Sequence, residues 1–110
     1  MSDHDFTAQQ AETFYTVAQF LKDKDVAVKE GQKINLDLQF VAGESPDPAA
    51  AIRALAMFGY EAAEAEEGGI EVQVPDVAFA AADIWLHEER TTKIVLDRGY
   101  LPDGWGFWGD

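Results

Sequence analysis

Apolar and polar residues alternate without a break along Ile34-Asn35-Leu36-Asp37-Leu38-Gln39-Phe40. A period of two predicts a β-strand with one buried face, here the face that carries Ile34, Leu36, Leu38 and Phe40. The stretch Ile70-Glu71-Val72-Gln73-Val74 alternates in the same way, and Pro75 is expected to end or bend its strand. These are the most regular strand patterns of the chain, as the central strands of a sheet would be.

Helical patterns lie on both sides of these strands. Thr7-Ala8-Gln9-Gln10 reads as a capping box, with Phe6 placed as its hydrophobic staple, and helical spacing then predicts a helix over residues 6–25. An alanine-rich, charged segment without proline or glycine predicts another helix over 78–98, which Gly99 ends.

A further helix is expected between the two regular strands. The loop at 43–48 opens it, Ser45 or Asp47 can cap it, and proline is tolerated in its first turn. Gly59 fits the position just past its end. Its apolar residues are expected to face the core: Ile52, Leu55, Ala56, Met57 and Phe58.

Two weaker strands complete the pattern. Residues 60–66 predict one, joined to the next strand by a tight turn at 67–69, and residues 105–108 predict a last short one. The order is a helix, then strand-helix-strand-strand-helix-strand. It predicts an α+β fold, a ferredoxin-like βαββαβ sandwich over residues 33–108 with an extra N-terminal helix, in one domain of residues 1–110.

The composition limits the class of protein. The chain has 110 residues, 47% of them hydrophobic, and no cysteine, which suffices for one core and excludes disulfides and thiolate chemistry. Residues 1–5 contain two aspartates and no basic residue, so they predict no secretory signal. No apolar stretch approaches the ~20 residues of a membrane span. We therefore expect a cytoplasmic protein with no membrane contact.

The charge is the second strong signal. Acidic residues outnumber basic ones by 21 to 8, a net charge of −13. Such a surface repels phosphate backbones, so direct nucleic-acid binding is not expected. It would attract basic partners, arginine-rich protein segments above all. The alternative is that the charge only keeps the protein dissolved.

Few residues offer catalytic or metal chemistry. The two histidines are His4 and His87, and Thr91 stands where a zinc helix beginning at His87 would need its second histidine. His87-Glu88-Glu89 is expected to be a solvated helix face. The chain has neither a nucleophile elbow nor a phosphate-binding glycine loop. We expect no catalysis, no metal and no cofactor.

Four glutamates gather around the second strand and its turn: Glu61, Glu64, Glu66 and Glu67. Alternation puts Glu64 and Glu66 on one face and Glu61 on the other. Such charges protect an edge strand against aggregation, or they form a docking edge for a basic partner. Both interpretations stay open at this point.

The C-terminal segment is the other candidate site, with Asp103, Gly104, Trp105, Gly106 and Trp108. Trp105 and Phe107 share a strand face and either fill the core or contribute to an interface, where tryptophan is enriched. Gly104 is expected at positive φ, and Gly106 permits close approach of another backbone. The tryptophans are therefore core or surface residues.

The outward face of the sheet is expected to be polar. It carries carboxylates and amides from the two regular strands: Asn35, Asp37, Gln39, Glu71 and Gln73. RNA-reading sheets of this topology need stacking aromatics and basic residues there instead. The N-terminal helix or a second copy of the chain, in a homodimer, could cover this face.

Two landmarks resemble the ribonuclease E inhibitor family, proteins of the regulator of ribonuclease activity B type. Met57-Phe58-Gly59-Tyr60-Glu61 is similar to the family's junction at the end of a helix, and Asp103-Gly104-Trp105-Gly106 to its C-terminal motif. The resemblance covers residues 33–108. It implies a ferredoxin-like, acidic, cytoplasmic and non-catalytic protein that binds the ribonuclease E scaffold and modulates RNA turnover.

The leading hypothesis is a small regulatory protein that binds a basic partner through the four glutamates and Asp103, with Trp105 or Trp108 as an apolar anchor. The alternative is a dimeric ferredoxin-like barrel that binds or converts a small molecule between two sheets. That alternative needs apolar and titratable residues on the outward face, or a closed apolar pocket holding His87 or a buried carboxylate.

Overall fold

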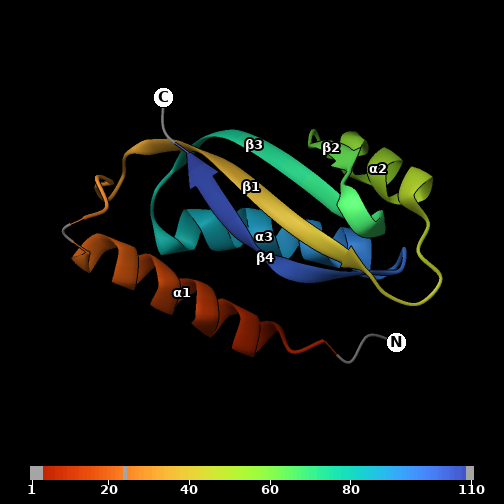
Figure 1. Cartoon of the computed structure of the whole chain (residues 1–110), viewed down its shortest axis with the longest axis horizontal. Helices are drawn as coiled ribbons and strands as arrows, with labels where there is room; N and C mark the ends of the chain where they lie inside the picture. Colours follow the sequence, from red (N-terminus) through yellow and green to blue (C-terminus); the bar gives the residue numbers. More distant parts are fainter. Residues whose placement is uncertain (1–3, 24, 109–110) are drawn as a thin grey trace.

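The computed structural model of the chain describes residues 4–23 and 25–108, which form an α+β fold (Figure 1). Its elements in chain order are α1 (Phe6–Lys22), β1 (Lys33–Ala42), α2 (Pro48–Met57), β2 (Glu61–Glu64), the 3-10 turn η1 (Glu66–Gly68), β3 (Ile70–Ala78), α3 (Ala81–Leu96) and β4 (Tyr100–Trp108). The strands form an antiparallel sheet in the order β2-β3-β1-β4. The expected α+β class is confirmed, and the two regular patterns are the central strands.

The helices lie on one face of the sheet. β1 and β3 turn their apolar residues to this face, where Leu36, Leu38, Ile70 and Val72 are at most 1% exposed. These residues share one hydrophobic core with side chains of all three helices, among them Val17, Leu55 and Ile84. α1 packs beside α3, next to β4, so it does not cover the outward face, which is turned to the viewer in Figure 1.

α1 begins at the predicted residue 6, but its cap and its end differ from the sequence pattern. Its N-cap is Asp5, whose Oδ1 accepts a hydrogen bond from the Ala8 N–H at 3.0 Å. The capping-box prediction at Thr7 was wrong, because an aspartate two residues upstream satisfies the free N–H groups first. The helix ends at Lys22 rather than residue 25, since Asp23 is already extended.

α2 begins as expected but ends differently. Asp47 is its N-cap and accepts from the Ala50 N–H at 3.1 Å, and Gly59 has a φ of +86° just past its end. The prediction that Met57 and Phe58 face the core was wrong, because they are 81% and 70% exposed. Met57 lies about 200° around the helix from Leu55, on the opposite side, and Phe58 follows the last helical residue.

The edge strand β2 is shorter than the expected 60–66. Tyr60 is buried in the core, and pairing with β3 covers only the four residues from Glu61 to Glu64. The expected tight turn at 67–69 is instead the turn η1, in which Glu67 has a φ of +58°. The extra turn places glutamates beside the end of the sheet rather than in the strand.

Two of the strands contain irregularities, one at Pro75, where the sequence pattern predicted an end or a bend, and one before residue 105, where it predicted a turn. β3 runs through Pro75 to Ala78, with a register shift against β1 and a φ of +58° at Asp76. β4 begins at Tyr100, well before the expected residue 105, because the segment 102–104 is a bulge within the strand and not a turn before it. Consequently β4 is a full-length neighbour of β1.

α3 is also shorter than the expected 78–98. Residue 78 still belongs to β3, and the helix spans Ala81–Leu96. Gly99 has a φ of +88°, as its predicted role at the helix end requires. In the described part of the chain, no helix combines the length and apolar character needed to cross a membrane.

Candidate functional site

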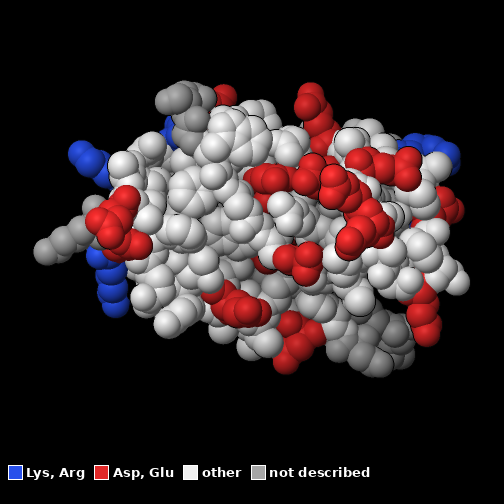
Figure 2. Space-filling view, in the orientation of Figure 1, with Lys and Arg blue, Asp and Glu red and all other residues white. Residues whose placement is uncertain are grey.

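The outward face of the sheet is polar, as predicted. Asp37 lies at its centre and accepts hydrogen bonds from two amide side chains, Gln73 Nε2 at 2.8 Å and Gln39 Nε2 at 3.3 Å. Figure 2 shows the acidic side chains gathered over this face, whereas Lys and Arg are seen toward the ends of the molecule. The face therefore presents fixed negative charge rather than a stacking platform.

A cavity of about 580 Å³ opens at one end of this face, where η1 and the β4 bulge rise beside β1 and β3. We call it the acidic groove. Five of the residues that line it are acidic, and none of the described residues that line it is Lys or Arg. The five are Glu64, Glu66, Glu67, Glu71 and Asp103.

The acidic groove brings together four of the predicted site residues and adds one. Glu64 comes from β2, Glu66 and Glu67 from η1, and Asp103 from the β4 bulge. Glu71 was expected on the outward face but was not named as a site residue. The alternation of β3 was the signal for it, because Glu71 and Asp37 project from neighbouring strands to the same face.

Glu61 lies apart from this group. It pairs with Gln73 at the other end of β2 and faces outward, on the opposite face from Glu64, as the alternation predicted. It lines a separate cavity over the edge of the sheet, together with Glu71. Glu71 therefore stands between the two cavities.

The C-terminal candidates divide between core and surface. Trp105 and Phe107 pair with Leu38 and Leu36, so their side chains point to the helix side, and the Phe107 ring lies 4.8 Å from the ring of Phe79. Trp108 pairs with Asn35 on the outward face and is 49% exposed. Trp105 is thus half-buried and packs against the core, and Trp108 is a surface residue.

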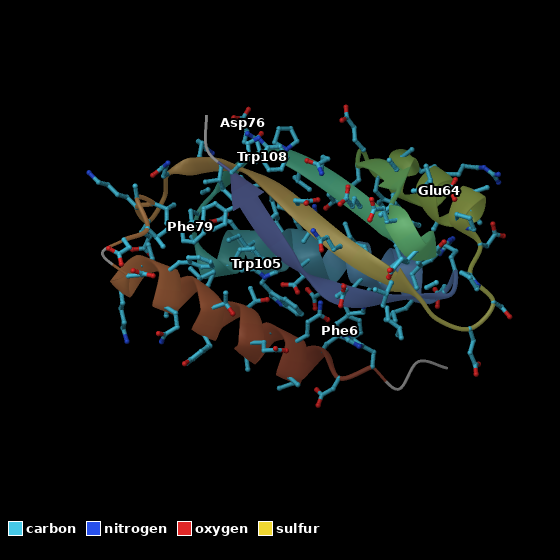
Figure 3. The ribbon with its side chains drawn as sticks, in the orientation of Figure 1. Phe6, Glu64, Asp76, Phe79, Trp105 and Trp108 are labelled. Carbon is cyan, nitrogen blue, oxygen red and sulfur yellow. The ribbon has the colours of Figure 1, made fainter. Side chains whose placement is uncertain are left out.

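The surface tryptophan is distant from the acidic groove. Figure 3 shows Trp108 beside Asp76 at one end of the sheet and Glu64 at the other end. Gly106 faces outward opposite Asp37, and Gly104 has a φ of +106° in the bulge. Asp103 is therefore the C-terminal candidate that joins the glutamates, whereas Trp105 lies on the helix side of the sheet.

A buried carboxylate between α1 and α3 went unnoticed in the sequence. Glu88 is 5% exposed and accepts hydrogen bonds from the Thr13 hydroxyl and from Gln9 Nε2, the latter at 3.0 Å. The expectation of a solvated face at residue 88 was wrong, because Glu88 follows the buried Ile84 by one helical turn. We call Gln9, Thr13, Glu88 and Thr92 the polar joint, because Gln9 also donates to Thr92 Oγ1 at 3.1 Å.

Burial raises the pKa of the Glu88 carboxyl, and the nearby charge of Glu12 acts in the same direction. The hydrogen bonds from Thr13 and Gln9 oppose the shift because they stabilise the carboxylate. A neighbouring cavity of about 410 Å³ is lined mainly by polar side chains, with Trp105 on one wall. It is therefore not the apolar pocket that the barrel alternative requires.

His87 faces a different site from Glu88. Its Nδ1 shares a hydrogen bond with the Tyr60 hydroxyl, with 3.0 Å between the two atoms. Burial lowers the pKa of His87, the charge of Arg90 lowers it further, and Asp83 acts in the opposite direction. A neutral imidazole bonded to a tyrosine fixes the β2 end of the core, and it is not paired with the Glu88 carboxylate for proton transfer.

Within the described residues, no group of three or more potential ligand side chains is arranged to hold a metal ion. No family model matches the sequence, and no curated protein matches it. The two cavities at the β2 end of the sheet are the features that suggest a function.

Proposed function

We propose that the protein binds a basic, arginine-rich segment of another protein in the acidic groove. The observation that carries this proposal is the convergence of five acidic residues from four elements on one cavity whose described lining holds no basic side chain. A guanidinium group can bond a carboxylate through two parallel N–H donors, so such a groove favours arginine. Binding of this kind needs no catalytic group.

The strength of this binding depends on the number of contacts. An exposed ion pair contributes about 0.2–1 kcal/mol, so a single pair would not bind a partner segment measurably. Several carboxylates act together, and the net charge of −13 also attracts a basic segment from a distance. We expect association that is fast and steeply weakened by salt.

The strand order β2-β3-β1-β4 supports assigning the fold as a ferredoxin-like sandwich with an additional N-terminal helix. With that assignment, the resemblance to ribonuclease E inhibitors extends the proposal to a cytoplasmic regulator of RNA turnover. In this form of the proposal, the partner is a basic segment of a ribonuclease E-like protein. The Asp103-Gly104-Trp105-Gly106 landmark contributes one groove carboxylate and one core side chain.

The geometry favours this proposal over a dimeric barrel. Pairing two outward faces would bring Asp37 and Glu71 against the same carboxylates of a second copy, and like charges there are destabilising. The buried carboxylate that could have supported a catalytic role is already hydrogen-bonded within the polar joint.

The first test is a fluorescence-anisotropy titration of a labelled oligoarginine peptide at low salt. The Glu66→Gln/Glu67→Gln variant should bind about tenfold more weakly, since it removes two groove charges. The matched control is Asp25→Asn/Glu30→Gln, which changes the net charge equally in the exposed segment before β1, at the other end of the sheet. Equal weakening by both variants would contradict binding of the peptide in the acidic groove.

A second test identifies the partner. The protein would be immobilised, exposed to an extract of the native cell at low salt, and eluted by a salt step for mass spectrometry. Recovery of a protein with basic segments, lost in the groove variant and kept in the control, supports the proposal. Partners that resist high salt would contradict an electrostatic mode of binding.

A further inference from the structure

The outer edge of β2 is open. Of the described strands, β2 pairs only with β3, and its other edge has no strand beside it. Glu61, Ala63 and Glu64 are exposed, and Ala62 is half-buried. An unpaired edge presents backbone N–H and C=O groups that another strand can bond.

A cavity of about 470 Å³ lies over this edge, which we call the edge groove. One side of the edge groove belongs to the helix layer and is apolar, with Ile52 and Ala56 of α2 beside Ala62. The other side belongs to the outward face and holds Glu61, Glu71 and Gln73. The edge is therefore reached from both faces of the sheet, one apolar and one negatively charged.

We propose that the β2 edge binds an extended segment in which basic residues alternate with apolar ones, as an added fifth strand. Side chains of a strand point alternately to the two faces of its sheet. One set would lie in the apolar side of the edge groove, and the other would meet Glu61 and Glu71. This inference rests on the proposed function, because it states how a basic partner segment is held next to the acidic groove.

A second copy of the chain does not fit this edge. A two-fold antiparallel pairing places residues of the same face opposite one another, so a pairing centred on Ala62 sets Glu61 of one copy diagonally beside Glu61 of the other on the outward face. Like charges this close oppose strand pairing, and each copy carries a net charge of −13. The same glutamate attracts an added strand that is basic, so the charges oppose self-association and favour a basic partner.

The end of α2 adds apolar surface near this edge. Met57 and Phe58 are 81% and 70% exposed, and only two residues separate Phe58 from the start of β2. A segment that continues past β2 on this side would reach them. The partner strand is therefore expected to carry an apolar residue beyond its paired stretch.

The test compares two short peptides of equal composition, one with alternating lysine and valine and one with the same residues in two blocks. The alternating peptide should bind about tenfold more tightly in a fluorescence-anisotropy titration at low salt. Backbone N–H groups also alternate in direction along a strand. N-methylation of one alternate set of peptide amides should therefore abolish binding, whereas methylation of the other set should change it less than about twofold.

The outcomes separate this inference from the proposed function. If both peptides and both methylated forms bind equally, charge alone holds the segment, so strand addition is wrong and the acidic groove stands. If oligoarginine also fails to bind, both proposals fall. Amide hydrogen exchange locates the strand: new protection at Glu61–Glu64 supports the inference, and protection along β4 instead would overturn it.

Discussion

Replacing Thr13 by valine tests whether the polar joint holds α1 to the rest of the molecule. Thr13 is 2% exposed, and its hydroxyl donates to Glu88 while accepting from Trp105 Nε1 at 3.3 Å. Valine keeps the shape of the side chain and removes both hydrogen bonds. Thr13→Val should lower the free energy of unfolding by about 2 kcal/mol at neutral pH.

The two lost bonds contribute unequally to this figure. A hydrogen bond to a charged group contributes about 1.5–3 kcal/mol, and the Glu88 carboxylate would keep only its bond from Gln9. The bond from Trp105 is long, and the half-buried indole can turn to water, so its loss adds little. For a domain of this size, the loss corresponds to a fall in Tm of roughly 8 °C.

The assay is urea unfolding at neutral pH, followed by tryptophan fluorescence, within a double-mutant cycle that includes Glu88→Gln. Thr16→Val is the control, because Thr16 lies one turn further along the same helix and is half-buried, and it should cost less than about 0.5 kcal/mol. A coupling energy near zero between residues 13 and 88, or a Thr13→Val cost equal to that of the control, would refute the polar joint as the attachment of α1.

Three further outcomes follow from the structure. Burial raises the pKa of Glu88 in the folded state above its ordinary 4.5. The stability that this shift contributes is therefore complete below pH 4.5 and is lost as the pH rises through the folded-state pKa. Urea unfolding should show the wild type gaining stability relative to Glu88→Gln as the solution is acidified. Gly99→Ala should lower the free energy of unfolding by about 3 kcal/mol or more, because Gly99 has a positive φ and the new Cβ would lie 2.6 Å from a backbone oxygen. Gly104→Ala, which also has a positive φ but open space around it, should lower it by only about 1 kcal/mol. Equal losses in thermal unfolding would contradict this prediction. Met57→Ser and Phe58→Ser should each change the unfolding free energy by less than about 0.5 kcal/mol, and a larger loss would mean that these side chains are buried in solution.

The central strands were predictable because their period is simple. Leu36 and Val72 are buried and Asp37 and Gln73 face outward, as strict alternation requires. Burial on one face leaves a strand only one register, so local pattern and tertiary structure agree there. Glu64, Glu66 and Glu67 are close in the sequence, so their gathering at one end of the sheet was visible as a charge cluster, and their role in binding stays a prediction.

The irregular positions were not predictable from local patterns. Pro75 was expected to end or bend its strand and Gly104 to lie in a turn, but pairing with β1 on either side carries β3 and β4 through them as bulges. Phe58 has the composition of a core residue, and only the end of α2 leaves it in solvent. Glu71 became part of the groove only because the turn η1 folds back over that end of the sheet.

Glu88 shows a different limit of sequence reasoning. Its helical phase matches that of Ile84, but a glutamate between charged neighbours is normally solvated. Burial becomes possible only because α1, from the other end of the sequence, brings Thr13 and Gln9 to it. Long-range hydrogen-bond partners of this kind leave no local trace in the sequence.

The way α1 is attached has a consequence for synthesis of the chain. Phe20 packs against the rings of Phe79, Trp105 and Phe107, and Thr13 bonds to Glu88, so α1 is held by segments that are made well after it. At ordinary translation rates the helix waits on the order of ten seconds for those partners to emerge from the ribosome. A lone helix of this length is marginal in water, so the nascent chain must shield its apolar side until β4 is complete.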